Sequence, residues 1–220
     1  TRLIMSGFLK IILRPLEIYI LSIAFIFTTA FDRNLDLENV DQTPVRDLLE
    51  IIHSTLQFFT EFEGFIGSVL LIFQFILIIW IMLGQKARLA TDLFAVILSF
   101  CWILELVSMN LLLVSPILDP IFLLLELVLF IPIILLGFSW WYWRLNHQKR
   151  MGFGKESISF DDNPTAMSYF IKTACIAVND TTEHGVCRTD TAKLIRIVNG
   201  LVVMDVFGLT LSRAVGLVIL

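Results

Sequence analysis

Long apolar stretches constrain this chain more than any other feature, because each must be buried in protein or in lipid. A helix that spans a bilayer needs about 20 mainly apolar residues. Five stretches reach that length, and the first begins at either Ile11 or Leu16. The first ends near residue 31, and the other four run over residues 65–83, 93–114, 117–140 and 192–220. The sequence therefore predicts an all-α integral membrane protein with about five transmembrane helices.

The balance of charged and apolar residues agrees with a membrane protein. Of the 220 residues, 57% are hydrophobic and 16% are charged, whereas soluble domains carry roughly 25% charged residues. A soluble protein of this size needs more polar groups to cover its surface. The formal net charge of −4 leaves no basic surface for nucleic acid. We therefore expect the lipid bilayer as a partner and no nucleic acid.

An amphipathic helix is predicted over residues 44–62, between the first two spans. Thr43 and Pro44 fit the N-cap and the first helical position. Apolar residues then recur at helical spacing at Leu48, Leu49, Ile52, Leu56 and Phe59. A helix of this kind typically lies at the membrane interface and packs on its neighbours.

Cationic residues predict the orientation of the chain in the membrane. They are Arg2, Lys10, Arg14, Lys86, Arg88, Arg144, Lys149 and Arg150. With five spans, all of these fall on one side, and the acidic stretch 32–41 falls on the other. We therefore expect a cytoplasmic N-terminus, and the same rule places residues 151–190 on the cytoplasmic side.

The pattern changes after Arg150, so we divide the chain into a helical bundle, 1–150, and a C-terminal region, 151–220. A moderately apolar piece, 167–178, is too short to span and is followed by a polar run, 179–190. A half-length helix, a polar loop and a full span indicate a re-entrant segment. Non-helical backbone at membrane depth must face protein or water, so we expect this loop to line the interior or a cavity.

A set of residues in the C-terminal region follows the order of a known pore layout. They are Tyr169, Phe170 and Thr173 in the short helix, and Asp190, Ala192, Lys193, Leu194, Gly200 and Gly208 in the last helix. With them, residues 169–217 resemble the pore region of the potassium-channel superfamily, which has an outer helix, a short pore helix, a filter loop and an inner helix. The resemblance implies a re-entrant pore helix and a homo-oligomer, because one inner helix cannot enclose a pore.

The nearer likeness is to uncharacterised bacterial membrane proteins that keep this layout without a filter. Their T-D-T-like turn, A-K-L-L-like helix start and A-R-A-V-like ending correspond here to residues 179–181, 192–195 and 212–215. The likeness implies a bacterial inner membrane and an ion-conducting or ion-sensing role. In that role, the constriction would be formed by Asn179, Asp180, Thr181 and Thr182.

The sequence departs from the superfamily at the filter itself. A potassium filter uses the consecutive backbone carbonyls of T-V-G-Y-G, whereas residues 177–182 read Ala-Val-Asn-Asp-Thr-Thr and contain no glycine. We therefore do not predict a potassium-selective filter. The orientation differs as well, because the pore loop of such channels is extracellular and the charge rule places residues 151–190 in the cytoplasm.

Three acids interrupt the predicted spans: Glu105, Glu126 and Asp205. An acid at the bilayer centre costs about 2.5–3.5 kcal/mol on insertion scales, so each is expected to face a partner or a cavity. Two interpretations stay open. The acids either pair with polar or cationic side chains inside the bundle, or they line a path for a cation or a proton.

Motifs of catalysis are missing, since the sequence contains no G-x-S-x-G, Walker loop, H-E-x-x-H or dinucleotide fingerprint. Glu183, His184 and Cys187 lack the second ligand pair that is typical of a metal site. We predict no enzymatic activity, no metal and no cofactor. The alternative to an ion-conducting role is a non-catalytic accessory subunit of a larger membrane complex, with the polar loop as its docking surface.

Overall fold

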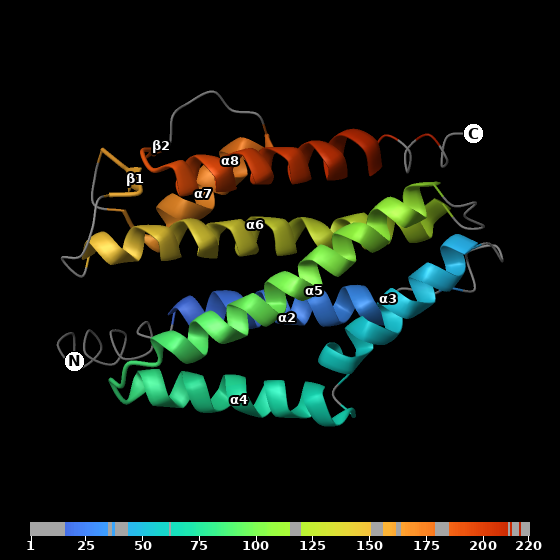
Figure 1. Ribbon diagram of the computed structural model, residues 1–220, viewed down its shortest axis with the longest axis horizontal. Coiled ribbons are helices and arrows are strands. Elements are labelled where there is room, and N and C mark those ends of the chain that lie inside the picture. The colour runs from blue at the N-terminus through green and yellow to red at the C-terminus, as the bar shows by residue number, and fades with distance from the viewer. Residues whose placement is uncertain are drawn as a thin grey trace, which may run out of the picture. The chain divides into compact units, whose positions relative to one another are not determined.

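The computed structural model describes residues 16–34, 37, 44–61, 63–114, 120–150, 156–161, 164–178, 185–210, 212 and 216. Contacts divide the chain into two compact units, Thr1–Leu118 and Asp119–Leu220, and each unit is described by itself. The described residues form seven α-helices, α2 to α8, and one two-stranded sheet (Figure 1). The division expected from the sequence lies at residue 150, whereas the contacts group residues 119–150 with the C-terminal residues.

The N-terminal unit contains four described helices. They are α2 (Leu16–Asn34), α3 (Pro44–Thr60), α4 (Phe65–Met82) and α5 (Arg88–Val114). α2 contacts the other three helices, and α3 contacts α4 and α5. Phe94 of α5 lies at the centre of this packing, with its ring edge-to-face on Phe25 of α2 and on Phe73 of α4.

The predicted amphipathic helix is confirmed as α3. It begins at Pro44, as expected, while Thr43 lies outside the described residues. The side chains of Leu49, Ile52 and Leu56 are buried, together with that of Thr60 one turn later. This spacing of three and four residues directs one face of α3 towards α2 and α5, because a helix repeats every 3.6 residues.

The C-terminal unit combines three helices with a short strand pair. Its elements are α6 (Pro120–Arg150), β1 (Ile158–Ser159), α7 (Ala166–Ala177), β2 (Val186–Cys187) and α8 (Asp190–Val203), which continues as a π-helix, η2 (Met204–Thr210). The strands are antiparallel, with Ile158 opposite Cys187. α6 contacts α7 and α8, and α7 contacts α8.

Three helices are long and apolar enough to cross a membrane: Phe65–Met82, Arg88–Leu112 and Leu124–Asn146. They confirm three of the five predicted spans by length and composition. The other two predicted spans are helical where the structure describes them and stay predictions as membrane spans. α2 carries charged residues at both ends, and α8 has 14 residues of α-helix before η2 begins.

Candidate functional site

The half-length helix expected at residues 167–178 is α7, which spans Ala166–Ala177. Its N-terminus is a capping box, in which the backbone N–H of Thr165 donates to Ser168 Oγ over 3.1 Å. Twelve residues of α-helix extend about 18 Å, well short of the roughly 30 Å of a hydrocarbon core. α7 therefore cannot span a bilayer, and it packs instead on both α6 and α8.

Asn146, near the end of α6, holds β1 through its side-chain amide. Its Nδ2 donates to the carbonyl oxygen of Ile158 over 2.9 Å, and its Oδ1 accepts from the N–H of Ile158 over 3.2 Å. The side-chain amide thus bonds both backbone groups of Ile158, as a neighbouring strand would. Nδ2 also donates to the hydroxyl of Tyr169 on α7 over 3.0 Å. One buried side chain thus links α6, β1 and α7.

The ring of Tyr169 adds aromatic contacts to the hydrogen bond made by its hydroxyl. The ring is fully buried and lies parallel to that of Trp143 on α6, with an interplanar angle of 8° and centroids 6.4 Å apart. Phe160, just after β1, meets the same ring edge-to-face at 5.0 Å. Tyr169, which the resemblance places at the start of a pore helix, therefore anchors α7 to α6.

Two hydroxyls continue the contact between α6 and α7. Ser139 Oγ on α6 donates to Thr173 Oγ1 over 3.2 Å, and Thr173 Oγ1 donates to the carbonyl oxygen of Tyr169 over 3.1 Å. Thr173 is fully buried, so its hydroxyl serves the packing of α7 on α6. On the α8 side, Asn199 Nδ2 donates to the hydroxyl of Tyr142 over 3.4 Å.

Lys172 is a buried cation on α7 that the sequence analysis did not single out. Its side chain is 4% exposed, and Nζ donates to the carbonyl oxygen of Gly185. Nζ also lies 5.7 Å from the centre of the Tyr142 ring, within range of a cation–π contact. A lysine in a short, largely apolar helix is the sequence signal that marks this position.

Gly185 itself adopts a backbone conformation that favours glycine, with a φ of +79°. A Cβ atom at this position would lie 2.7 Å from the ring of Phe160. The hydrogen bond from Lys172 to Gly185 fixes the chain directly before β2. The predicted constriction residues, Asn179, Asp180, Thr181 and Thr182, lie outside the described residues.

The three predicted intramembrane acids fall in different units. Glu105 is fully buried on α5 of the N-terminal unit, and Glu126 is fully buried on α6 of the C-terminal unit. Asp205 is partly exposed in η2. Each of the three interacts with another group, and the interpretation that they are paired inside the bundle stays a prediction. The interpretation as a path for a cation or a proton stays open.

The residues considered as metal ligands are only partly described. Glu183 and His184 lie outside the described residues, while the thiol of Cys187 on β2 is free and buried. Within the described ranges, no group of three His, Cys, Asp or Glu side chains is arranged to hold a metal ion.

A second polar cluster lies in the N-terminal unit and corrects one expectation. The sequence analysis assigns Asp32 to an acidic connection outside the membrane, but Asp32 belongs to α2 and is 3% exposed. Thr60 Oγ1 donates to Asp32 Oδ2 over 2.6 Å, and His53 Nδ1 lies 3.0 Å from Asp32 Oδ1. Both partners come from α3, 21 and 28 positions away in the chain, so the spacing of residues could not reveal the cluster.

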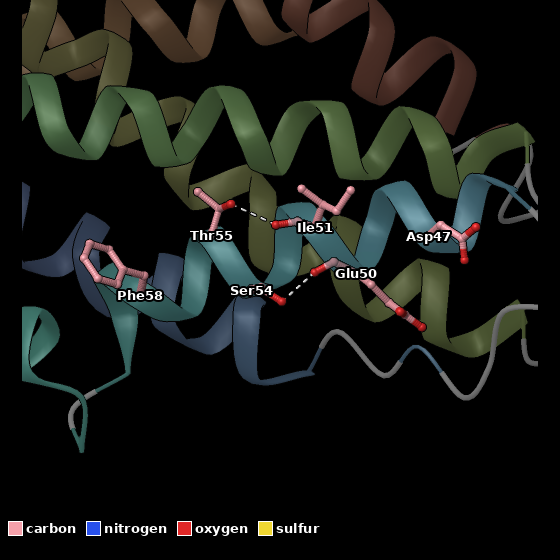
Figure 2. A pocket seen from close by; sticks show the side chains of 6 residues that line it. All are labelled: Asp47, Glu50, Ile51, Ser54, Thr55 and Phe58. Carbon is pink, nitrogen blue, oxygen red and sulfur yellow. Dashed lines mark hydrogen bonds between the residues drawn. The ribbon is translucent and has the colours of Figure 1, made fainter.

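An open hollow also lies along one side of α3, as Figure 2 shows. It is lined by Asp47, Glu50, Ile51, Ser54, Thr55 and Phe58. The two hydroxyls donate to backbone carbonyls one turn earlier in the same helix, so they are already engaged. The remaining polar groups are the carboxylates of Asp47 and Glu50 on the same helix, and Glu50 is paired with Arg46 at 3.1 Å.

Comparisons with known proteins leave the C-terminal unit as the main guide to function. No family model, no curated protein and no solved structure matches the chain. The residues and contacts of the chain itself therefore carry the proposed function.

Proposed function

We propose that the C-terminal unit is a pore-type module that conducts or senses ions without a potassium-selective filter. The observation that carries this proposal is the packing of the half-length helix α7 on both α6 and α8. A polar segment, 179–184, then connects α7 to the strand before α8. This order corresponds to the outer helix, pore helix, loop and inner helix that the resemblance implies.

The ion in this proposal is a cation, selected by acidic and hydroxyl side chains. Asn179, Asp180, Thr181 and Thr182 form the constriction, and Asp205 follows along the path. Rings of acidic side chains select cations in channels, whereas potassium selectivity requires a filter of backbone carbonyls. The proposed module therefore distinguishes ions by charge rather than by the geometry of a potassium filter.

A pore of this kind requires several copies of the chain. The last helix supports self-association, because the apolar side chains of Leu194, Ile197 and Leu201 on α8 and of Met204 at the start of η2 are 59% to 70% exposed within the chain. Their spacing of three and four residues places them on one face. In a bacterial inner membrane, this face would meet the same helix of a neighbouring copy or a helix of another subunit.

The first test is the mass of the assembly extracted gently from its native membrane, with every component identified. A homo-oligomer is the expected result and leads directly to flux measurements in liposomes. A stable complex with other proteins would contradict the pore proposal.

Within a homo-oligomer, Asp180→Asn is expected to lower cation flux into liposomes severalfold, because it removes the acidic ring from the constriction. Asp161→Asn is the matched control, since Asp161 is an exposed acid in the turn after β1. Flux should not change in this control. Equal flux in the wild type and in Asp180→Asn would remove Asp180 from the ion path.

A second function is that of a non-catalytic accessory subunit in a larger membrane complex. It is favoured by the missing filter glycines and by the charge rule, which places residues 151–190 on the cytoplasmic side. In this case one copy per complex is expected. The polar run 179–190 would be the first place to look for a partner contact.

A further inference from the structure

A buried carboxylate and a histidine from different helices meet in the N-terminal unit. Asp32 in the last turn of α2 has one oxygen, Oδ2, that accepts the hydroxyl of Thr60. The other oxygen, Oδ1, lies 3.0 Å from Nδ1 of His53 on α3. Both atoms are buried, and neither forms a hydrogen bond among the described residues. Their contact is therefore one of ion-pair distance between a carboxylate oxygen and a ring nitrogen.

The opposite side of the imidazole contacts an exposed side chain. His53 Nε2 lies 2.9 Å from the amide nitrogen of Gln57, one turn later on α3. An amide nitrogen donates and does not accept. With this nitrogen facing the ring, Nε2 of His53 is the acceptor, so the proton of the neutral ring is on Nδ1, the nitrogen that lies 3.0 Å from Asp32 Oδ1.

The same neighbours can also stabilise the ring of His53 after it has bound a second proton. An imidazolium donates from both nitrogens. A half-turn of the Gln57 amide brings its oxygen to Nε2, and Asp32 continues to face Nδ1. Because a buried charge is tolerated where it is paired, the imidazolium also provides the counter-charge for Asp32. In either protonation state, Nδ1 stays beside the carboxylate of Asp32.

The surroundings of the pair carry further negative charge. A second buried acid, Glu105, lies on α5, which packs on both α2 and α3. Other charged groups near the pair are Arg33, which is exposed on α2, and Glu50 on α3, which is paired with Arg46. The sequence of α4 contains no titratable residue. The buried charges around His53 are therefore acidic.

We propose that Asp32, His53 and Gln57 form a proton-binding site at the junction of α2 and α3. The proton comes from solvent on the exposed side of α3, where Gln57 is exposed and the His53 side chain is 19% exposed. It binds to Nε2 of His53, and the resulting imidazolium pairs with the carboxylate of Asp32. The site is independent of the pore proposal, because all of its residues belong to the N-terminal unit.

The test is nitrogen NMR of the full chain in lipid nanodiscs with labelled histidine. The chain has three histidines, so His147→Gln and His184→Gln identify the signal of His53. Under alkaline conditions, the neutral ring of His53 is expected to carry its proton on Nδ1. At a pH at which the wild type shows both ring forms, the imidazolium fraction of His53 is expected to fall severalfold in Asp32→Asn.

Two further variants keep the test decisive if Asp32→Asn does not fold. Gln57→Leu alters an exposed position and is expected to lower the imidazolium fraction, because the acceptor for Nε2–H is lost. Asp47→Asn, an exposed acid on the same helix, is expected to leave it unchanged. A neutral ring protonated on Nε2 would overturn the proposal. So would an imidazolium fraction that neither Asp32→Asn nor Gln57→Leu reduces.

Discussion

Replacing Asn146 by alanine is expected to lower the free energy of unfolding of the C-terminal unit by about 3 kcal/mol or more, because a buried polar group without a partner costs about 1–3 kcal/mol. The substitution removes both bonds to the backbone of Ile158 and the bond to Tyr169. It also detaches β1 from α6. Thermal and denaturant unfolding in detergent, compared with the wild type, measures the loss.

Tyr169→Phe is the matched control, because it removes only one of the three hydrogen bonds and retains the ring. The expected loss is about 1 kcal/mol. If the two variants lost the same stability, the amide of Asn146 would not hold β1 as described.

The second large effect is expected for Gly185→Val, which should destabilise the C-terminal unit by about 2–5 kcal/mol. A left-handed backbone costs a residue with a Cβ atom about 1–2 kcal/mol, and overpacking typically adds about 1–3 kcal/mol. Here the new side chain would meet the ring of Phe160. The same change would displace the carbonyl that accepts from Lys172. Unfolding in detergent is again the measurement.

Gly200→Ala provides the control for this prediction. Gly200 lies inside α8, and a Cβ atom there would meet nothing within 4 Å. Alanine is favoured over glycine in a helix by about 1 kcal/mol, so unchanged or slightly higher stability is expected. A loss in Gly200→Ala as large as that in Gly185→Val would contradict the argument from local geometry.

Helices with a strong apolar pattern could be predicted from the sequence. The spans at 65–83, 93–114 and 117–140 correspond to α4, α5 and α6, although α6 continues to Arg150. The amphipathic pattern at 44–62 corresponds to α3. These predictions succeed because periodicity and length are properties of a continuous segment, and burial of one face follows from them.

The candidate site was less accessible from the sequence. The half-length helix α7 was predicted, and its tyrosine and threonine were singled out, but Asn146, Lys172 and Gly185 were not. Each of these three acts on a residue 12 or 13 positions away in the chain. A contact between separate elements depends on how those elements pack, and a local sequence pattern does not specify that packing.

The apolar pattern of the chain was sufficient to predict that most of it is helical, that three of its helices suit a bilayer, and that one short helix precedes a polar segment. The packing of α6 with α7 and α8, and the position of Asp32 beside His53, became apparent from the structure. The physical reason is that hydrophobicity selects which face of a helix is buried. The partner of that face, and the polar groups trapped beside it, depend on the three-dimensional packing of all the helices.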